Sequence, residues 1–306
     1  MDSGKTRVTG IMCALIGGIL WGISGVCGQF LFQHKGVTAT WLVPIRLTSA
    51  GTFLLLYFLL RDHKRALSVW KGRRNAVDIL VYAIAGMMLC QYSYFQTIEW
   101  SNAGTATVIQ YLGPAMTVIY VCVSERQRPK RKEIFAVFLA LSGIFLIATH
   151  GRPGTLALSQ KALSMGLLSA VALVIYTVKP RRLLTQFPAP LILAWGMLIG
   201  GIVLMVLMRP WRHMPQLDAQ LIGVLLVIIV LGTMTSFSLY LHSVKLIGPV
   251  QAGLFACVEP VAATVLSVVC MKESFVAMDL LGFVLIVATV FVLAVPEKRE
   301  VWIEKS

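Results

Sequence analysis

The chain has 306 residues, of which 58% are hydrophobic and only 13% are charged, and its mean hydropathy is +0.81. Soluble domains carry roughly 25% charged residues, so this composition excludes a globule in water and makes the bilayer the expected solvent. The net charge of +14 does not indicate a nucleic-acid partner, because the basic residues lie in short loops between apolar runs, where the positive-inside rule explains them.

Ten apolar runs are long enough to cross a bilayer, since one crossing takes about 20 residues as a helix. Lipid offers no hydrogen-bond partners, so each run must satisfy its own backbone, which favours helices throughout. The sequence therefore predicts an all-α integral membrane protein. The ten expected transmembrane helices lie near residues 9–32, 38–60, 76–98, 102–124, 132–150, 160–179, 189–208, 219–243, 248–271 and 276–295.

The distribution of Lys and Arg between the two sides of the membrane sets the expected orientation of the chain. The first run, 9–32, is too long for the apolar region of a signal peptide and lacks a small-residue cleavage site, so we expect it to be the first span. Twenty Lys and Arg then fall on the side of the amino terminus, Lys298, Arg299 and Lys305 among them, and six on the other side. Both termini are therefore expected in the cytoplasm.

The second half of the chain repeats the first at a constant offset of 146 residues. Tyr94 corresponds to Tyr240, Pro114 to Pro260, and Gly86 to Gly232. A repeat with an odd number of spans must insert upside down relative to its copy, and inverted repeats are typical of alternating-access transporters. We expect two inverted five-helix repeats, residues 1–152 and 153–306, with a substrate site between them near the membrane midplane.

Other classes of protein are less well supported. The six cysteines all lie in apolar runs, with no CxxC pair and no histidine at ligand spacing, so inert thiols are favoured over disulfides or a metal site, and no cofactor is expected. A membrane-embedded enzyme would need a motif such as HExxH or GxSxG, and neither occurs. A sensor or scaffold normally carries a soluble output domain, and no run of this chain has the length for one.

Two formal charges lie well inside the expected spans, where a charge costs about 2.5–3.5 kcal/mol. Glu259 precedes Pro260, which has no N–H and so frees a backbone carbonyl one turn earlier, near Ala256. A carboxyl beside such a break is either a proton or cation site, or a neutral group that bonds across helices. Arg46 is suited to a substrate carboxylate, but it is equally suited to pairing with Glu259 or to capping carbonyls.

Neutral polar residues follow helical stripes, each of which indicates either a wet cavity or bonding between helices. For Gln91, Gln110, Tyr111 and His242 together we favour the cavity. His242 is the only histidine in an expected span, and it either relays a proton or anchors the helix at the interface. The stripes are Gln91 and Tyr94; Thr107, Gln110, Tyr111 and Pro114; Thr235, Ser238 and His242; and Gln251, Phe255 and Glu259.

Aromatic and small residues complete the candidate features. Trp21, Tyr94, Tyr176 and Trp195 lie away from the helix ends where aromatic belts gather, so they either stack on a substrate or pack between helices. The pairs Gly18/Gly22 and Gly196/Gly200 allow helices to approach closely. Residues 134–150 and 276–295 of the fifth and tenth expected spans are uniformly apolar, which predicts that these spans face lipid or a second copy in a homodimer.

Several of these residues form patterns that resemble the EamA branch of the drug/metabolite transporter superfamily, which is built from two tandem five-helix units. The second half gives the sharper match, and the first half departs from it by carrying Gly113 where the second has Glu259. The resemblance covers nearly the whole chain. Its residues are Trp21-Gly22, Pro44-Ile45-Arg46, Leu112-Gly113-Pro114, Glu125, Gly248-Pro249, Val258-Glu259-Pro260-Val261 and Lys272-Glu273.

The resemblance implies a multi-pass transporter in the bacterial inner membrane that moves small metabolites, often amino acids, frequently outward. Proton coupling is the working assumption that it brings. An alternative within the superfamily is a carrier of nucleotide-sugars or sugar phosphates, which would need several cationic side chains in the cavity. Arg46 is the one that the spans provide.

Overall fold

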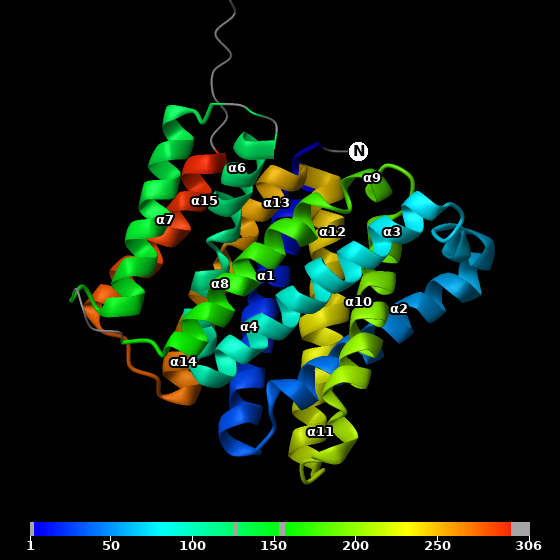
Figure 1. Cartoon of the computed structure of the whole chain (residues 1–306), viewed down its shortest axis with the longest axis horizontal. Coiled ribbons are helices and arrows are strands. Elements are labelled where there is room, and N and C mark those ends of the chain that lie inside the picture. Colours follow the sequence, from blue (N-terminus) through cyan, green and yellow to red (C-terminus); the bar gives the residue numbers. More distant parts are fainter. Residues whose placement is uncertain (1–2, 125, 127, 153–156, 295–306) are drawn as a thin grey trace, which may run out of the picture.

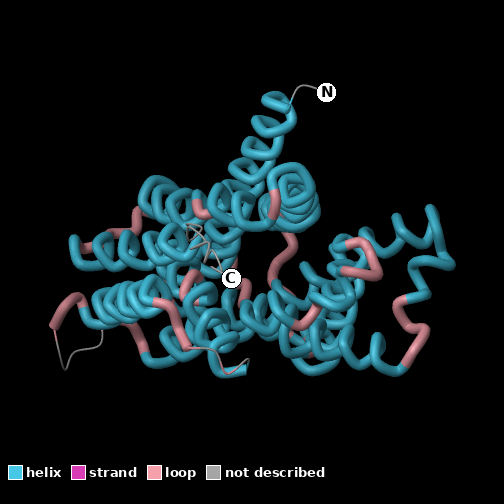
Figure 2. Tube along the Cα trace, turned by 90° about the horizontal axis from the view of Figure 1, so that it is seen from above, coloured by secondary structure: helices cyan, strands magenta, loops and turns pink. Residues whose placement is uncertain are grey.

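A computed structural model describes residues 3–124, 126, 128–152 and 157–294, and its described residues form helices joined by short loops (Figures 1 and 2). Glu125 and the carboxy-terminal Lys298, Arg299 and Lys305 lie outside the described residues, as does the start of the predicted second repeat. Among the described residues, nine helices are long and apolar enough to cross a membrane, and a tenth apolar helix, Ala277–Leu293, is shorter. The predicted all-α membrane fold is confirmed.

The first half contributes five predicted spans, two of which are built from more than one helical segment. The third span changes from α-helix to π-helix and back, and the fourth is broken in the middle. The segments are α1 (Ser3–His34); α2 (Ala39–Ser68); α3 (Arg73–Val81), η1 (Tyr82–Met88) and α4 (Leu89–Trp100); α5 (Ala103–Gln110) and α6 (Gly113–Ser124); and α7 (Arg131–Thr149).

The second half shows the same anatomy. Its third span again contains a π-helix and its fourth span is again broken. The segments are α8 (Gln160–Val178) with the short α9 (Arg181–Leu184); α10 (Ala189–Met208) with the 3₁₀ turn η2 (Pro210–Arg212); α11 (Ala219–Leu226), η3 (Val227–Thr235) and α12 (Ser236–Ile247); α13 (Pro249–Ala256) and α14 (Val258–Met271); and α15 (Ala277–Ala294).

These irregularities fall at positions that the 146-residue offset makes equivalent. Tyr82–Met88 corresponds to residues 228–234 of η3, and Tyr111, which ends α5, corresponds to Cys257, which ends α13. The packing also relates equivalent helices of the two halves: α2 lies on α10 and α7 on α15, while α1 packs on α12 as α8 packs on α4. Both observations support the predicted repeat, whose boundary at 152/153 stays a prediction.

Close packing at small residues brings α1 to the centre of the bundle (Figure 1). A Cβ atom at Gly22 would lie 3.0 Å from the Ala263 nitrogen and 3.1 Å from the Glu259 carbonyl oxygen, so only glycine allows α1 this near α14. Gly18 has the same role, one turn nearer the amino terminus. The predicted use of this glycine pair in helix approach is confirmed.

The pair α7 and α15 lies at one edge of the molecule (Figure 1). Their outward side chains are apolar and exposed, with Phe138 64% and Val284 63% accessible. Such a surface suits lipid or a second copy, as the composition predicts, and the choice between them stays a prediction. The last turns of α15 depart from that prediction, because Val290 and Leu293 turn inward to the central cavity.

Candidate functional site

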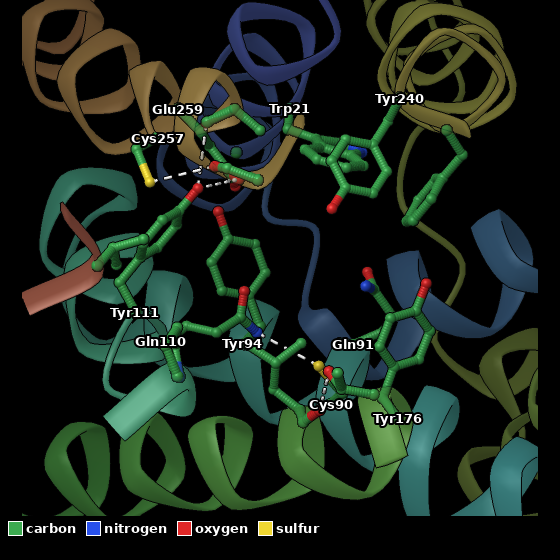
Figure 3. A pocket seen from close by; sticks show the side chains of 18 of the residues that line it. Trp21, Cys90, Gln91, Tyr94, Gln110, Tyr111, Tyr176, Tyr240, Cys257 and Glu259 are labelled. Carbon is green, nitrogen blue, oxygen red and sulfur yellow. Dashed lines mark hydrogen bonds between the residues drawn. The ribbon is translucent and has the colours of Figure 1, made fainter. Parts of the chain in front are cut away.

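A cavity of about 450 Å³ lies at the centre of the bundle, and both halves of the chain line it (Figure 3). Its walls come from two helix pairs that the repeat relates, α1 with α12 and α4 with α8, and from the breaks in the fourth and ninth spans. Of the predicted site residues, the lining includes Trp21, Arg46, Gln91, Tyr94, Gln110, Tyr111, Tyr176 and Glu259.

Glu259 occupies the first turn of α14, immediately after the break at Cys257. Its Oε2 accepts a hydrogen bond from the Tyr111 hydroxyl at 3.2 Å, and the same hydroxyl lies 3.2 Å from the carbonyl oxygen of Ala256. The freed carbonyl predicted from Pro260 is therefore present. Its partner is Tyr111, which itself ends α5 at the break of the fourth span.

Arg46 is buried, with 3% of its surface exposed, and its guanidinium is held on three sides. Its Nε donates to Thr233 Oγ1 at 2.8 Å, its Nη1 donates to Gln91 Oε1 at 3.1 Å, and its Cζ lies 4.7 Å from the centre of the Phe95 ring. Within the described chain, neither these bonds nor any ion pair joins Arg46 to Glu259, so the predicted alternative of a direct pair is wrong.

The cation and the carboxyl are thus anchored separately. Figure 3 shows the hydroxyls of Tyr111 and Tyr94 near Glu259, whereas Gln91, the partner of Arg46, lies toward Tyr176 in this view. An amphoteric molecule between them would meet an acidic group and a basic group at different points of one cavity.

The other polar side chains of the lining are fixed by neighbours. The Tyr94 hydroxyl lies 2.7 Å from Thr107 Oγ1, and Gln110 Nε2 donates to Cys90 Sγ at 3.4 Å. Hydrogen bonds of this kind orient Tyr94 and Gln110 before a ligand enters. A preformed lining costs less to order on binding.

Aromatic rings form much of the remaining wall. Trp21 meets Phe237 edge-on, with ring centres 4.9 Å apart, and lies 5.2 Å from the Tyr240 ring. Tyr176 stacks on Tyr82 at 5.4 Å. These surfaces accept either an apolar group or a cation over their faces.

Three predicted site residues do not lie in the cavity, which corrects the prediction. Trp195 donates from Nε1 to the Ala66 carbonyl at 3.0 Å and packs edge-on against Trp70. Ser238 and His242 are exposed, and Ser238 bonds back to the Met234 carbonyl at 2.6 Å.

The reason lies in the packing of α12. Trp21 of α1 packs against Phe237 and Tyr240, so the face of α12 that carries these two rings is turned toward α1 and the cavity. At about 100° per residue, Ser238 lies about 130° round α12 from the midpoint of Phe237 and Tyr240, and His242 lies almost opposite them. The polar stripe at Thr235, Ser238 and His242 is therefore turned from the cavity, while Phe237 and Tyr240 face it.

Several lining residues were not predicted from the sequence, although the repeat points to some of them. Tyr240 is the equivalent of Tyr94 at the 146-residue offset, and both line the cavity. Ser24 is a counterpart of the predicted Tyr176, since each packs on the equivalent glycine of the opposite half, Gly232 for Ser24 and Gly86 for Tyr176. Phe95 and Cys90 carried no such signal.

A buried polar network that the sequence did not reveal lies beyond one end of the cavity. One turn beyond Gly25 along α1, the fully buried Gln29 accepts from the Ala103 backbone N–H at 2.9 Å and donates to Glu273 at 2.7 Å. It thereby fastens α1 to the start of α5 and the end of the ninth span. In the other direction the lining continues to Thr177 and Leu293, near the ends of α8 and α15.

The described residues contain no group of three or more His, Cys, Asp or Glu placed to hold a metal ion. All six cysteines are free thiols. The described lining provides a cavity with one carboxyl, one guanidinium and aromatic walls.

The chain is similar to known membrane transporters. The model of the EamA-like transporter family matches residues 8–149 and again residues 160–295. YicL, an uncharacterized inner membrane transporter of Salmonella typhimurium, is 34% identical over 296 residues, which cover 97% of this chain and 98% of YicL. An uncharacterized transporter of Clostridium kluyveri is 22% identical over 91% of this chain and 90% of its own length.

The fold also has a counterpart among solved structures. One crystal structure, 18% identical in sequence, superposes with a TM-score of 0.60 over 94% of this chain and 96% of its own. At this level of identity the likeness shows the helical architecture alone.

Proposed function

Because the chain belongs to the EamA-like transporter family, and is a multi-pass transporter of the inner membrane, we propose that it exports amino acids or similar small amphoteric metabolites by alternating access. The observation that carries this proposal is the separate anchoring of Arg46 and Glu259 in one aromatic-walled cavity. The guanidinium suits a carboxylate, and Glu259 suits an ammonium group or a proton.

The proposed coupling of transport to protons follows from Glu259, which is the only carboxyl among the described lining residues. Glu259 must lose its proton to bind an ammonium group, so one site holds either a proton or the substrate. A carrier that alternates between these two loads exchanges inward protons for outward substrate. The first repeat offers Gly113 at the equivalent position, so only one half supplies the coupling group.

A carrier of nucleotide-sugars or sugar phosphates is a weaker proposal. Those anions need several cationic side chains, and among the described residues Arg46 is the only Lys or Arg of the lining.

The first experiment identifies a ligand. Purified protein is screened by thermal denaturation against amino acids, amines, nucleosides and nucleotide-sugars, because any ligand that binds only the folded state raises the melting temperature. Stabilisation by amphoteric compounds supports the proposal. Stabilisation confined to nucleotide-sugars would replace it with the alternative.

The second experiment tests coupling with the compound so identified. In proteoliposomes, Glu259→Gln is expected to abolish the acceleration of transport by an imposed pH gradient, because the amide cannot release a proton. Asp62→Asn, an acid-to-amide change on an exposed side chain, is expected to keep it. An unchanged response in Glu259→Gln would remove this residue from the coupling mechanism.

A further inference from the structure

The break in the ninth span leaves a backbone carbonyl without its helical donor. Ala256 ends α13, and its carbonyl oxygen would accept from the backbone nitrogen of residue 260 in a continuous helix. Pro260 has no hydrogen on that nitrogen. A Cβ atom at Gly18 would lie 2.8 Å from this oxygen, so α1 covers it closely and leaves a side chain to supply the missing bond.

Tyr111 is the side chain that supplies this bond, and its hydroxyl has one hydrogen for two acceptors. It lies 3.2 Å from the Ala256 carbonyl oxygen and 3.2 Å from Glu259 Oε2. A carbonyl and an ionised carboxylate both accept only, so the hydroxyl can satisfy one of them and not both.

The number of hydrogens differs between the two states of Glu259. When Glu259 is ionised, charge-assisted bonding draws the Tyr111 hydrogen to the carboxylate, and the Ala256 carbonyl is left unpaired. When Glu259 is protonated, its own O–H donates to the Tyr111 oxygen, which frees the Tyr111 hydrogen for Ala256. Glu259, Tyr111 and the Ala256 carbonyl are then all paired, whereas the unpaired carbonyl of the ionised state carries a free-energy cost.

We propose that Tyr111 is a positioning residue that links the protonation of Glu259 to the stability of the break between α13 and α14. When Glu259 is protonated, the hydrogen bond from Tyr111 to the Ala256 carbonyl stabilises the backbone at the break. When Glu259 is ionised, that hydrogen bond is lost and the backbone there opens more easily. Because Tyr111 lies at the break of the fourth span, the same contact joins the broken spans of both halves.

Other ionisable groups line the cavity: Arg46 from α2, Cys90 and Tyr94 from α4, Tyr176 from α8, Tyr240 from α12 and Cys257 at the break itself. Of these side chains and Tyr111, only the Tyr111 hydroxyl is hydrogen-bonded to Glu259 among the described residues, so the link is assigned to it. The inference rests on the proposed function only in taking Glu259 as the group that gains and loses the proton.

Hydrogen exchange tests the link without any transported compound. The exchange of backbone amides in residues 254–262 is measured by mass spectrometry in lipid nanodiscs across a range of pH, and each rate is divided by its intrinsic rate. Infrared difference spectra of the same samples follow the carboxyl band of Glu259, which is identified by its loss in Glu259→Gln.

In the natural protein we expect this segment to exchange about tenfold faster when Glu259 is ionised, a ratio that corresponds to about 1.4 kcal/mol. Tyr111→Phe is expected to lose the difference while the carboxyl band still titrates. The matched control Tyr120→Phe, on an exposed tyrosine of α6, is expected to keep it. A tenfold difference that persists in Tyr111→Phe would overturn the proposal.

Glu259→Gln gives a second test should Tyr111→Phe not assemble. Its amide donates to Tyr111 at every pH, so the segment is expected to stay slow throughout, and exchange that still rises with pH would overturn the link. The failures are distinguishable: a carboxyl band that does not titrate in the natural protein contradicts the coupling role of Glu259, whereas one that titrates without affecting exchange contradicts the role of Tyr111 alone.

Discussion

Arg46 shows how hydrogen bonds and an aromatic ring offset the free-energy cost of burying a charge inside the bundle. A guanidinium has five N–H donors in a fixed plane, and here Thr233 and Gln91 accept from two of its nitrogens while the Phe95 ring covers its face. Thr233 is itself held, because its hydroxyl donates to the Ile228 carbonyl inside the π-helix at 2.8 Å. The charge is therefore positioned by a preformed set of partners.

This geometry predicts that Arg46→Lys lowers the melting temperature by several degrees, because a lysine ammonium cannot form both bonds and also stack on the ring. A loss of about 1.5–3 kcal/mol is the usual cost of a hydrogen bond to a charged group. Unfolding is followed with a thiol-reactive dye, for which the free cysteines serve as reporters. Arg212→Lys, on an exposed arginine, is the control and should melt as the natural protein does.

At the scale of the helices, the irregular segments decide what the cavity contains. The π-helices η1 and η3 contain Gly86 and Gly232, on which Tyr176 and Ser24 pack closely. The helix breaks at Tyr111 and Cys257 then bring backbone groups to the cavity, which both residues line. π-Helical turns are often found at functional sites, and broken spans line cavities because their freed backbone groups need partners.

The contact between α1 and α14 predicts that the same glycine-to-alanine change has opposite effects on the melting temperature at two positions. Gly22→Ala should lower the melting temperature, because the new Cβ would lie 3.0–3.1 Å from the backbone and the Ala262 side chain of α14. Overpacking of this kind costs about 1–3 kcal/mol. The same change at Gly223, where no atom lies within 4 Å, should leave the melting temperature equal or raise it, since alanine is the better helix former. A fall of equal size in both variants would contradict the close contact.

At the scale of the whole molecule, ion pairs join the spans that form the cavity walls. One pair links the first span to the eighth at one end of the molecule, and two pairs link the third span to the sixth at the opposite end. Lys35, just after α1, bonds Asp218 at the start of α11 at 2.6 Å. At the opposite end of the molecule, where α3 lies (Figure 1), Asp78 accepts from Arg182 at 2.8 Å and lies 3.0 Å from Lys179. The hydrogen bond from Lys35 lowers the pKa of Asp218, so this clamp holds at neutral pH and weakens as acid protonates the carboxylate.

The orientation of the molecule is a prediction that labelling can settle. Arg74 and Met214 are exposed at the amino ends of the third and eighth spans, which lie at opposite ends of the molecule (Figure 1). In a cysteine-free variant, a membrane-impermeant maleimide should label Met214→Cys in intact cells and Arg74→Cys only after lysis. The reverse pattern would place both termini outside.

Much of the fold follows from the sequence because hydropathy is a local property. A run of about 20 apolar residues has few choices in lipid other than a helix, and the 146-residue offset marks equivalent positions. The same reasoning placed Glu259, Arg46 and Gln110 toward a wet interior. It went wrong at Ser238, because a polar stripe shows only that a helix has a distinct face.

By itself, then, the sequence determined the helical class, the succession of spans, the break at Pro260 and the two intramembrane charges. The tertiary structure alone decided which face of each helix lines the cavity, and that Tyr111 reaches Ala256 across 145 residues of chain. The physical reason is that a helix is turned by the closest packing available to it, here glycine against backbone, and such contacts depend on both partners at once.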